Sequence, residues 1–261
     1  MSTETQTAIL GKFVWHDHMS GDIEKAKSFY TELLGWDVEE VDVGDEKYPM
    51  IKNDGGMHGG FGASQGGAPP HWLGHVAVED ADETAEKVKA GGGTIYFGPS
   101  DIPDIGRFFV FADPQGAVLS AFASASPPEG PPAEGTFAWD ELATSDVDGA
   151  KKFYGDVFGW TSKDMDMGGG MIYTIFERPG GGEAGAAGCM ALTDEMKSNN
   201  VPPNWLVYIG TEDVDASTDK AKELGATVYM PPTDIAEVGR FSVLADPTGA
   251  AFALFKGIPQ S

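Results

Sequence analysis

The chain has 261 residues, of which 41% are hydrophobic and 22% are charged, and this length and composition suit two globular domains. Its formal net charge of −24 repels nucleic-acid phosphates and anionic lipid, so neither nucleic acid nor a membrane surface is an expected partner. The single cysteine, Cys189, excludes an internal disulfide. No apolar run approaches the ~20 residues of a membrane span, and the N-terminal residues lack the pattern of a signal peptide, so we expect a cytoplasmic protein.

Hydrophobic periodicity predicts a strand, a helix and three further strands in residues 13–63. The β-branched and aromatic run FVWHDHM predicts the first strand. In DIEKAKSFYTELLG the apolar residues recur at helical spacing, Asp22 can cap the helix and Gly35 can end it. The segments WDVEEVDV, KYPMIKN and HGGFGA then predict three short strands. The order of this module is therefore βαβββ.

The same order restarts in residues 71–122. HWLGHVAVE predicts a strand, and Asp80 begins a helix that has Glu83 placed for a capping box and Gly91 at its end. TIYFG, GRFFVFAD and AVLSAF predict three more strands. The last two are joined by the tight turn DPQG, in which Pro114 has the fixed φ that the second position favours. The first half of the chain thus contains two successive βαβββ modules.

The second half of the chain repeats the first. Trp15 and the helix end FYTELLGW recur 124 residues later, at Trp139 and in FYGDVFGW, and GRFFVFADPQGAVLSAF recurs 133 residues later as GRFSVLADPTGAAFALF. The second copy therefore has nine extra residues, which we expect in the glycine-rich segment GGGEAGAAG. A segment rich in proline and small residues separates the copies. We expect one domain at residues 8–124, a linker at 125–135 and a second domain at 136–256.

The module order, the helix ends FYTELLGW and FYGDVFGW, and the closing DPQGA and DPTGA together resemble the vicinal oxygen chelate superfamily of glyoxalases, bleomycin-resistance proteins and extradiol dioxygenases. The tandem arrangement is similar to two-domain glyoxalase-like proteins of the actinobacterial type. The resemblance implies an α+β fold of two tandem glyoxalase-like domains, in each of which two βαβββ modules curl one sheet into a half-open barrel around a cavity. It does not fix a reaction, because one fold hosts many chemistries.

In the metal-dependent members of this superfamily, His or Gln on the first strand of each module and Glu on the last strand hold one divalent ion, which polarises a substrate with two neighbouring oxygens. These positions fall here on residues without an imidazole or a carboxylate, namely Trp15, Leu73 and Ser120 in the first domain and Trp139, Leu206 and Ala253 in the second. The remaining position, on the fourth strand, has no definite alignment within MHGGFG or AAGCMA. Such side chains do not hold the usual ions, so we expect no metal cofactor.

Strand alternation assigns the candidate ligand-binding residues. Trp15 and Asp17 share one face of the first strand, and a tryptophan and a carboxylate recur at the same spacing in the second copy. An aromatic plate, a carboxylate and a further polar ring suit a flat or polar organic molecule. The full set of expected ligand-binding residues is Trp15, Asp17, His75, Arg107, Ser120, Trp139, Glu141, Tyr208 and Arg240. Three alternatives stay open: core packing for the tryptophans, a solvated strand edge for Asp17 and Glu141, and pairing of the arginines with loop aspartates such as Asp101.

These features favour a glyoxalase-like protein with degenerate metal sites that binds a small organic molecule. The alternative is a metal-dependent lyase or oxygenase that uses a shifted site in the first domain, formed by Asp17, His58 and His75 around a divalent ion. A third interpretation gives the duplicated domain a structural role. The sequence leaves open whether the protein is an enzyme, which residues would be catalytic, and whether it is a monomer or a homodimer.

Overall fold

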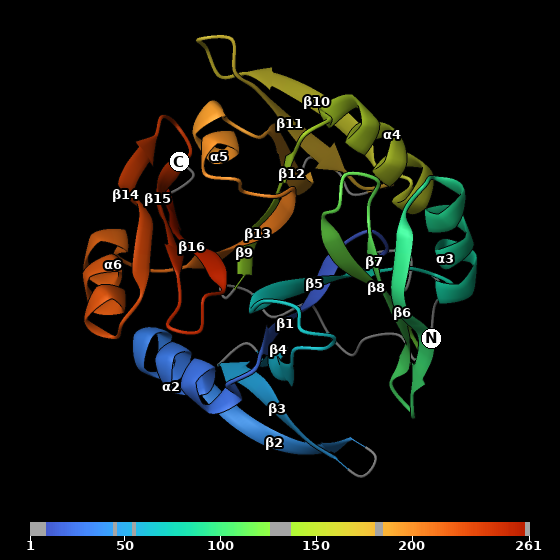
Figure 1. Cartoon of the computed structure of the whole chain (residues 1–261), viewed down its shortest axis with the longest axis horizontal. Coiled ribbons are helices and arrows are strands. Elements are labelled where there is room, and N and C mark those ends of the chain that lie inside the picture. Colours follow the sequence, from blue (N-terminus) through green and yellow to red (C-terminus); the bar gives the residue numbers. More distant parts are fainter. Residues whose placement is uncertain (1–8, 44–45, 54–55, 126–136, 181–184, 259–261) are drawn as a thin grey trace. The chain divides into compact units, whose positions relative to one another are not determined.

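The computed structural model of the chain describes residues 9–43, 46–53, 56–125, 137–180 and 185–258 (Figure 1). The elements of the first half are β1 (Phe13–Ser20), α2 (Ile23–Leu34), β2 (Asp37–Val43), β3 (Glu46–Asn53), β4 (Gly56–Ala63), β5 (His71–Ala77), α3 (Ala81–Ala90), β6 (Thr94–Ile102), β7 (Gly106–Ala112) and β8 (Val118–Ser124).

The second half repeats this order with one addition. Its elements are β9 (Phe137–Thr144), α4 (Val147–Phe158), β10 (Thr161–Asp166), β11 (Ile172–Glu177), β12 (Gly185–Ala191), α5 (Asp194–Ser198), β13 (Asn204–Gly210), α6 (Val214–Glu223), β14 (Thr227–Ile235), β15 (Gly239–Ala245) and β16 (Ala251–Gly257). The predicted βαβββ order is confirmed for all four modules. The short helix α5, between β12 and β13, is the element that the sequence analysis did not predict.

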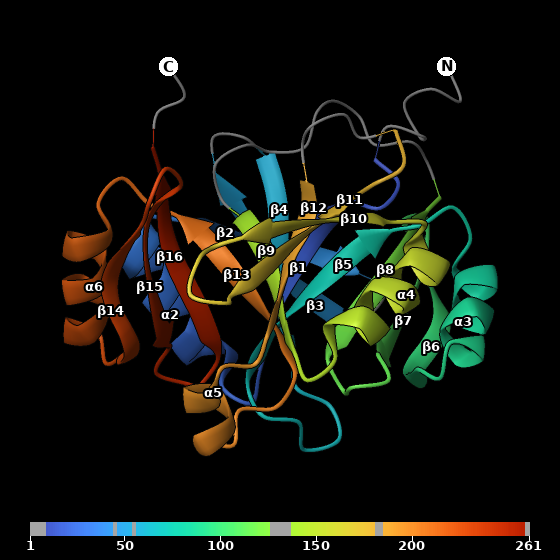
Figure 2. The same cartoon turned by 90° about the horizontal axis from the view of Figure 1, so that it is seen from above.

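Each half of the chain forms one curled eight-stranded sheet, which confirms the predicted α+β class and the two tandem glyoxalase-like domains. The strand orders are β2-β3-β4-β1-β5-β8-β7-β6 and β10-β11-β12-β9-β13-β16-β15-β14. In every module the first strand pairs in parallel with the last. Helix α3 lies along β6 and helix α6 lies along β14 (Figure 2). No helix in the described part of the chain is long and apolar enough to cross a membrane.

Local signals in the sequence set the ends of the helices. The carboxylates of Asp22 and Asp146 each accept a hydrogen bond from the backbone amide three residues on, at 3.1 and 3.0 Å, so α2 and α4 begin where a cap satisfies a free amide. Gly35 and Gly159 follow these helices with φ of 70° and 71°, a left-handed conformation that glycine adopts without a steric penalty. The predicted cap and the predicted helix end are confirmed.

Contacts within the chain define two compact units, and each unit combines one module from each half. Unit 1 comprises Met1–Trp15, Gly74–Pro131 and Asp140–Trp205, and unit 2 comprises His16–Leu73, Pro132–Trp139 and Leu206–Ser261. Each unit has its own buried core, which in unit 1 includes Phe109, Phe111 and Phe153 and in unit 2 includes Phe29, Phe252 and Leu254. A helix from one half therefore packs with strands from the other. Apart from Ala125, the expected linker at 125–135 lies outside the described residues.

The strand register shows where the nine extra residues of the second half lie. Asp17 is paired with Gly60, and its counterpart Glu141 is paired with Gly188, so the offset between the halves has grown from 124 to 128 at β12 (188 − 60). Four extra residues therefore precede this point, and the other five follow it, where α5 adds five helical residues. The expectation that all nine lie in the glycine-rich segment is wrong, because a connection can also lengthen by an added turn of helix.

Candidate functional site

Unit 2 contains a buried chain of hydrogen bonds that runs from an indole to the DPTG turn. Trp72 Nε1 donates to Tyr30 Oη at 2.9 Å, and Tyr30 Oη donates to Asp246 Oδ2 at 3.1 Å. The other carboxylate oxygen, Oδ1, accepts bonds from three backbone amides of the turn and from the Thr248 hydroxyl, at 2.6 to 3.2 Å. Helix α2 of the first half is thus fastened to a turn at the end of the second half.

Unit 1 contains the same network, built from the complementary modules. Trp205 Nε1 donates to Tyr154 Oη at 3.0 Å, Tyr154 Oη donates to Asp113 Oδ2 at 2.9 Å, and Asp113 Oδ1 accepts three amides of the DPQG turn. In each unit the tyrosine comes from one half of the chain and the aspartate from the other. This exchange explains why the closing phrase occurs twice: each core needs one FY helix and one DPxG turn.

The two networks differ at one buried position. In unit 2, His18 Nε2 lies 2.6 Å from Asp246 Oδ2, and both side chains are fully buried. The residue 124 positions later, Leu142, is also fully buried but apolar. The His18 ring packs against Phe61 and Trp72, and its Nδ1 has no hydrogen-bond partner among the described residues. Unit 2 therefore holds a buried imidazole–carboxylate pair where unit 1 holds an apolar contact.

This difference reverses the direction in which the carboxyl pKa moves. Burial raises the pKa of Asp113, and the bonds from Tyr154 and the turn offset this only in part. Burial acts in the same direction on Asp246, but the hydrogen bond and charge of His18, together with bonds from Thr248, outweigh it and lower the pKa of Asp246.

Trp15 and Asp17 were predicted to share one face of β1. His18 lies on the buried face, where its ring contacts Tyr30 of α2, so alternation places Trp15 and Asp17 on the opposite face. The Asp17 carboxylate accepts a hydrogen bond from the hydroxyl of Tyr48 on β3. This tyrosine was not predicted from the sequence, because its counterpart in the second half, Tyr173 of β11, becomes apparent only from the strand register.

The other expected ligand-binding residues lie on the inner strands of the sheets. His75 is paired in register with Ser120, and Tyr208 with Ala253. The Ser120 side chain is fully buried and its hydroxyl donates to the backbone carbonyl of Phe109 at 3.1 Å, so its proton is used within the sheet. The expected role of Ser120 as a ligand contact is not supported for this reason.

Strand β9 carries the second tryptophan and carboxylate. Trp139 and Glu141 are two residues apart on this strand, as Trp15 and Asp17 are on β1. The Glu141 backbone is in register with Gly188 of β12, which has no side chain above the sheet. That Trp15, Asp17, His75, Trp139, Glu141 and Tyr208 bind a ligand stays a prediction.

Arg107 and Arg240 anchor a strand to a helix. Arg107 donates from Nε to Asp82 on α3 at 2.8 Å and from Nη1 to Asp101 on β6 at 2.8 Å. Arg240 makes the same two contacts with Asp215 and its strand aspartate, at 2.7 and 2.9 Å. The structure thus favours the alternative of aspartate pairing over the expected ligand clamp. The helix aspartate was missed because 25 residues separate it from the arginine.

Arg107→Ala and Arg240→Ala should therefore leave ligand binding unchanged and lower the melting temperature only slightly, because ion pairs in contact with solvent contribute little. Thermal unfolding of both variants, followed by titration of the ligand that the wild type binds, measures the two effects. A variant that keeps its melting temperature but loses the ligand would restore the clamp interpretation.

The shifted metal site expected as an alternative has no support in the positions of its residues. The His58 ring packs against Trp36 and Phe137 in the aromatic core, and its Nδ1 lies 3.0 Å from the carbonyl of Gly56. Burial lowers the pKa of His58 and so favours the neutral ring. Among the described residues, no group of three or more His, Cys, Asp or Glu side chains is arranged to hold a metal ion. The donors present do not fit the family's divalent ion.

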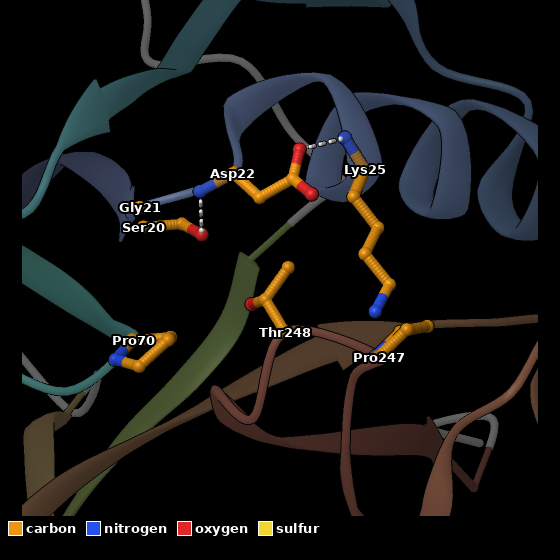
Figure 3. A pocket seen from close by; sticks show the side chains of 7 residues that line it. All are labelled: Ser20, Gly21, Asp22, Lys25, Pro70, Pro247 and Thr248. Carbon is orange, nitrogen blue, oxygen red and sulfur yellow. Dashed lines mark hydrogen bonds between the residues drawn. The ribbon is translucent and has the colours of Figure 1, made fainter.

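A small pocket lies at the N-terminal end of α2 in unit 2 (Figure 3). It has a volume of about 260 Å³ and is lined by Ser20, Gly21, Asp22, Lys25, Pro70, Pro247 and Thr248. Asp22 caps the helix there, while the Lys25 side chain extends beside Pro247 (Figure 3). None of these residues was predicted from the sequence to line a pocket. The repeat places Gly149 at the position of Lys25, so the second copy does not reproduce the charge of this pocket.

The model of the Glyoxalase/Bleomycin resistance protein/Dioxygenase superfamily matches residues 15–120 and 136–254, which is most of both halves. The chain belongs to this superfamily. The resemblance found in the repeated motifs is thereby confirmed, and the two matched segments coincide with the two sheets.

Two relatives have similar sequences over nearly their whole length. The chain is 36% identical over 255 residues to "Putative glyoxylase CFP32" of Mycobacterium tuberculosis (strain CDC 1551 / Oshkosh), an alignment that covers 94% of this chain and 95% of the relative. It is 31% identical over 266 residues to the anthracycline biosynthesis protein DauV of Streptomyces sp. (strain C5), which covers 94% of this chain and 92% of that protein.

Solved structures of a dioxygenase and of a glyoxalase share the fold. The 2,3-dioxygenase LapB from Pseudomonas sp. KL28 matches with a TM-score of 0.64 and 14% identity over 97% of this chain and 95% of that one. The Mn(II)-bound glyoxalase from Novosphingobium aromaticivorans matches with a TM-score of 0.61 and 17% identity over 94% of this chain and 82% of that one. At these identities the likeness concerns the fold alone.

Proposed function

We propose that this protein binds a flat, polar organic molecule against the strand faces that carry Trp15 and Trp139, and that it does so without a catalytic metal ion. The observation that carries the proposal is the chemistry of the family's ligand positions. The positions that align hold indole, alkyl and hydroxyl groups in place of imidazoles and carboxylates, and the Ser120 hydroxyl is bonded within the sheet. Indole rings offer large apolar faces for stacking, so the residues at these positions favour binding of a ligand over catalysis by a metal ion acting as a Lewis acid.

The relatives suggest a class of ligand. The name of one of them, DauV, assigns that protein to anthracycline biosynthesis. Anthracyclines are flat, polar and aromatic, which agrees with an indole face for stacking, as Trp15 provides, and with a carboxylate that holds a hydroxyl donor, as Asp17 and Tyr48 provide. An anthracycline is therefore the first probe that we would use.

Titration of an anthracycline into the protein should quench tryptophan fluorescence, because the ligand would stack on an indole. Trp15→Leu and Trp139→Leu should each remove one part of the quench, and calorimetry should show a matching loss of heat. The melting temperature of each variant controls for misfolding. If both variants keep the full quench, the ligand binds elsewhere and the assignment of these two tryptophans has to be dropped.

Elemental analysis separates the proposed binding protein from the metal-dependent alternative. Protein purified without an affinity tag should contain less than one equivalent of Fe, Zn, Ni or Mn, and a chelator should not lower its melting temperature. One tightly held divalent ion that is lost in Asp17→Ala or His75→Ala would instead support the lyase or oxygenase alternative.

A further inference from the structure

Three exposed methionines mark the tip of the β10–β11 hairpin in unit 1. The side chains of Met165, Met167 and Met171 are 44%, 38% and 49% exposed, although methionine usually fills core gaps. The sequence between them, MDMGGGM, places two thioethers two residues apart and the third across a glycine turn. Gly168, Gly169 and Gly170 all have positive φ, of 82°, 64° and 84°, which only glycine adopts readily in succession.

Strand register puts the three thioethers on one face of this hairpin. The backbone amide of Met167 donates to the carbonyl of Met171 at 2.9 Å, directly beyond the pair formed by Asp166 and Ile172. Met167 and Met171 are therefore opposite each other, and opposite residues have Cβ atoms roughly 5 Å apart. Met165 precedes Met167 by two residues and so points to the same side. Three flexible thioethers can thus converge on one point.

The opposite face of the hairpin is occupied by polar contacts that hold it in place. Asp164 accepts a hydrogen bond from Thr174 at 2.7 Å and another from Lys151 of α4 at 2.8 Å. The equivalent hairpin of the first half, β2–β3, keeps a lysine–glutamate pair at this place, between Lys27 and Glu40 at 3.5 Å. The polar face is common to both copies and is explained by folding.

The methionine face is not common to both copies. The positions equivalent to the three methionines are Val41, Val43 and Glu46, by the same register. A hairpin of this fold therefore forms without any thioether, and packing within the hairpin does not account for three exposed ones. This contrast points to a role for the sulfur atoms themselves.

We propose that the tip of the β10–β11 hairpin binds Cu(I) through the thioethers of Met165, Met167 and Met171. Thioethers are soft donors that select Cu(I) over the harder divalent ions. The net charge of −24 favours a cation over an anion at this surface. Cys189 does not compete for the ion, because it is fully buried and burial raises the pKa of its thiol to about 12. Binding involves no change of oxidation state.

The test is an anaerobic titration of the full chain, without a histidine tag, against Cu(I) held by a weak chromophoric chelator. The wild type should withdraw one equivalent from the chelator. Met165→Leu/Met167→Leu/Met171→Leu keeps the size and the apolar character of the side chains but removes the sulfur, and it should withdraw none. Methionine methyl NMR with Ag(I), which has the same donor preference, should shift three of the ten methionine signals.

A matched control replaces Met19, Met50 and Met190 with leucine and should keep the full equivalent. Retention of the ion by the triple leucine variant of the hairpin would move the site to other residues, most simply the five histidines. A wild type that withdraws no Cu(I) would overturn the proposal outright, as would binding of Zn(II) with equal strength at the same three methyl signals.

Discussion

Replacing Asp246 with alanine should destabilise unit 2 by about 3–5 kcal/mol, because it leaves a buried imidazole and a buried tyrosine hydroxyl without their acceptor. The carboxylate accepts bonds from His18 at 2.6 Å and from Tyr30 at 3.1 Å, and its other oxygen holds the DPTG turn. Asp113→Ala removes three amide contacts of its turn and the same type of tyrosine partner in unit 1, but neither a histidine nor a threonine hydroxyl. Its cost should be smaller, at about 1–3 kcal/mol.

Urea unfolding at neutral pH gives these free energies, and hydrogen exchange resolves them by unit. Exchange should accelerate in α2 and β16 for Asp246→Ala and in α4 and β8 for Asp113→Ala. Asp219, which pairs with Lys222 on the surface of α6, supplies a control that should change nothing measurable. Equal losses at Asp246 and Asp113 would show that His18 adds nothing to the network.

The fold was predictable because its signals are local. The cap Asp22 and the helix end Gly35 act within a few residues, and strand alternation put Trp15 and Asp17 on one face of β1, opposite His18. The hydrogen bond between the tyrosine of the FY helix and the aspartate of the DPxG turn was not predictable in this way. Tyr30 and Asp246 are 216 residues apart, and no local pattern indicates that such residues meet. The one signal was that tyrosine and aspartate both recur in the two copies.

The candidate site was predicted less completely, for the same reason. Tyr48 donates to Asp17 across two neighbouring strands, and its recurrence as Tyr173 was visible only once the strand register was known. Arg107 was expected near a ligand because a loop arginine suits an anion. In the structure its donors are taken by Asp82 and Asp101, since an aspartate in the first turn of a helix lies within reach of the next hairpin.

His18→Leu should change the pH dependence of stability in unit 2, because it replaces the histidine by the residue that unit 1 uses at the equivalent position, Leu142. Loss of a buried hydrogen bond to a charged group should cost about 1.5–3 kcal/mol at neutral pH. The variant should still fold, since Leu142 is accommodated beside the same type of network in unit 1. The informative quantity is therefore how this cost varies with pH.

The pKa shifts of the two carboxyl groups, Asp246 and Asp113, determine whether the cost of His18→Leu rises or falls with pH. In the wild type the pKa of Asp246 is lowered from 3.8, so its contribution is present above the unfolded pKa and is lost as the pH falls through the folded one. In the variant Asp246 should behave as Asp113 does, with a raised pKa. A raised carboxyl pKa gives stability at low pH that is lost as the pH rises through it. The cost of His18→Leu should therefore be smallest in acid and grow toward neutral pH.

Urea unfolding of both proteins at a series of pH values measures this trend, with hydrogen exchange in α2 reporting on unit 2. The titratable groups that face the pair are Tyr30 and His71. Burial and the charge of Asp246 raise the pKa of Tyr30 so far that it does not titrate in this range. Burial and the charge of His18 lower the pKa of His71. His71→Gln therefore serves as a control for titration outside the pair. In an Asp246→Asn background the cost of His18→Leu should lose the part of its rise toward neutral pH that the carboxyl group contributes, because that group is gone. A cost that rises toward neutral pH as steeply in that background as with Asp246 present would assign the effect to another group and refute the role of the His18–Asp246 pair.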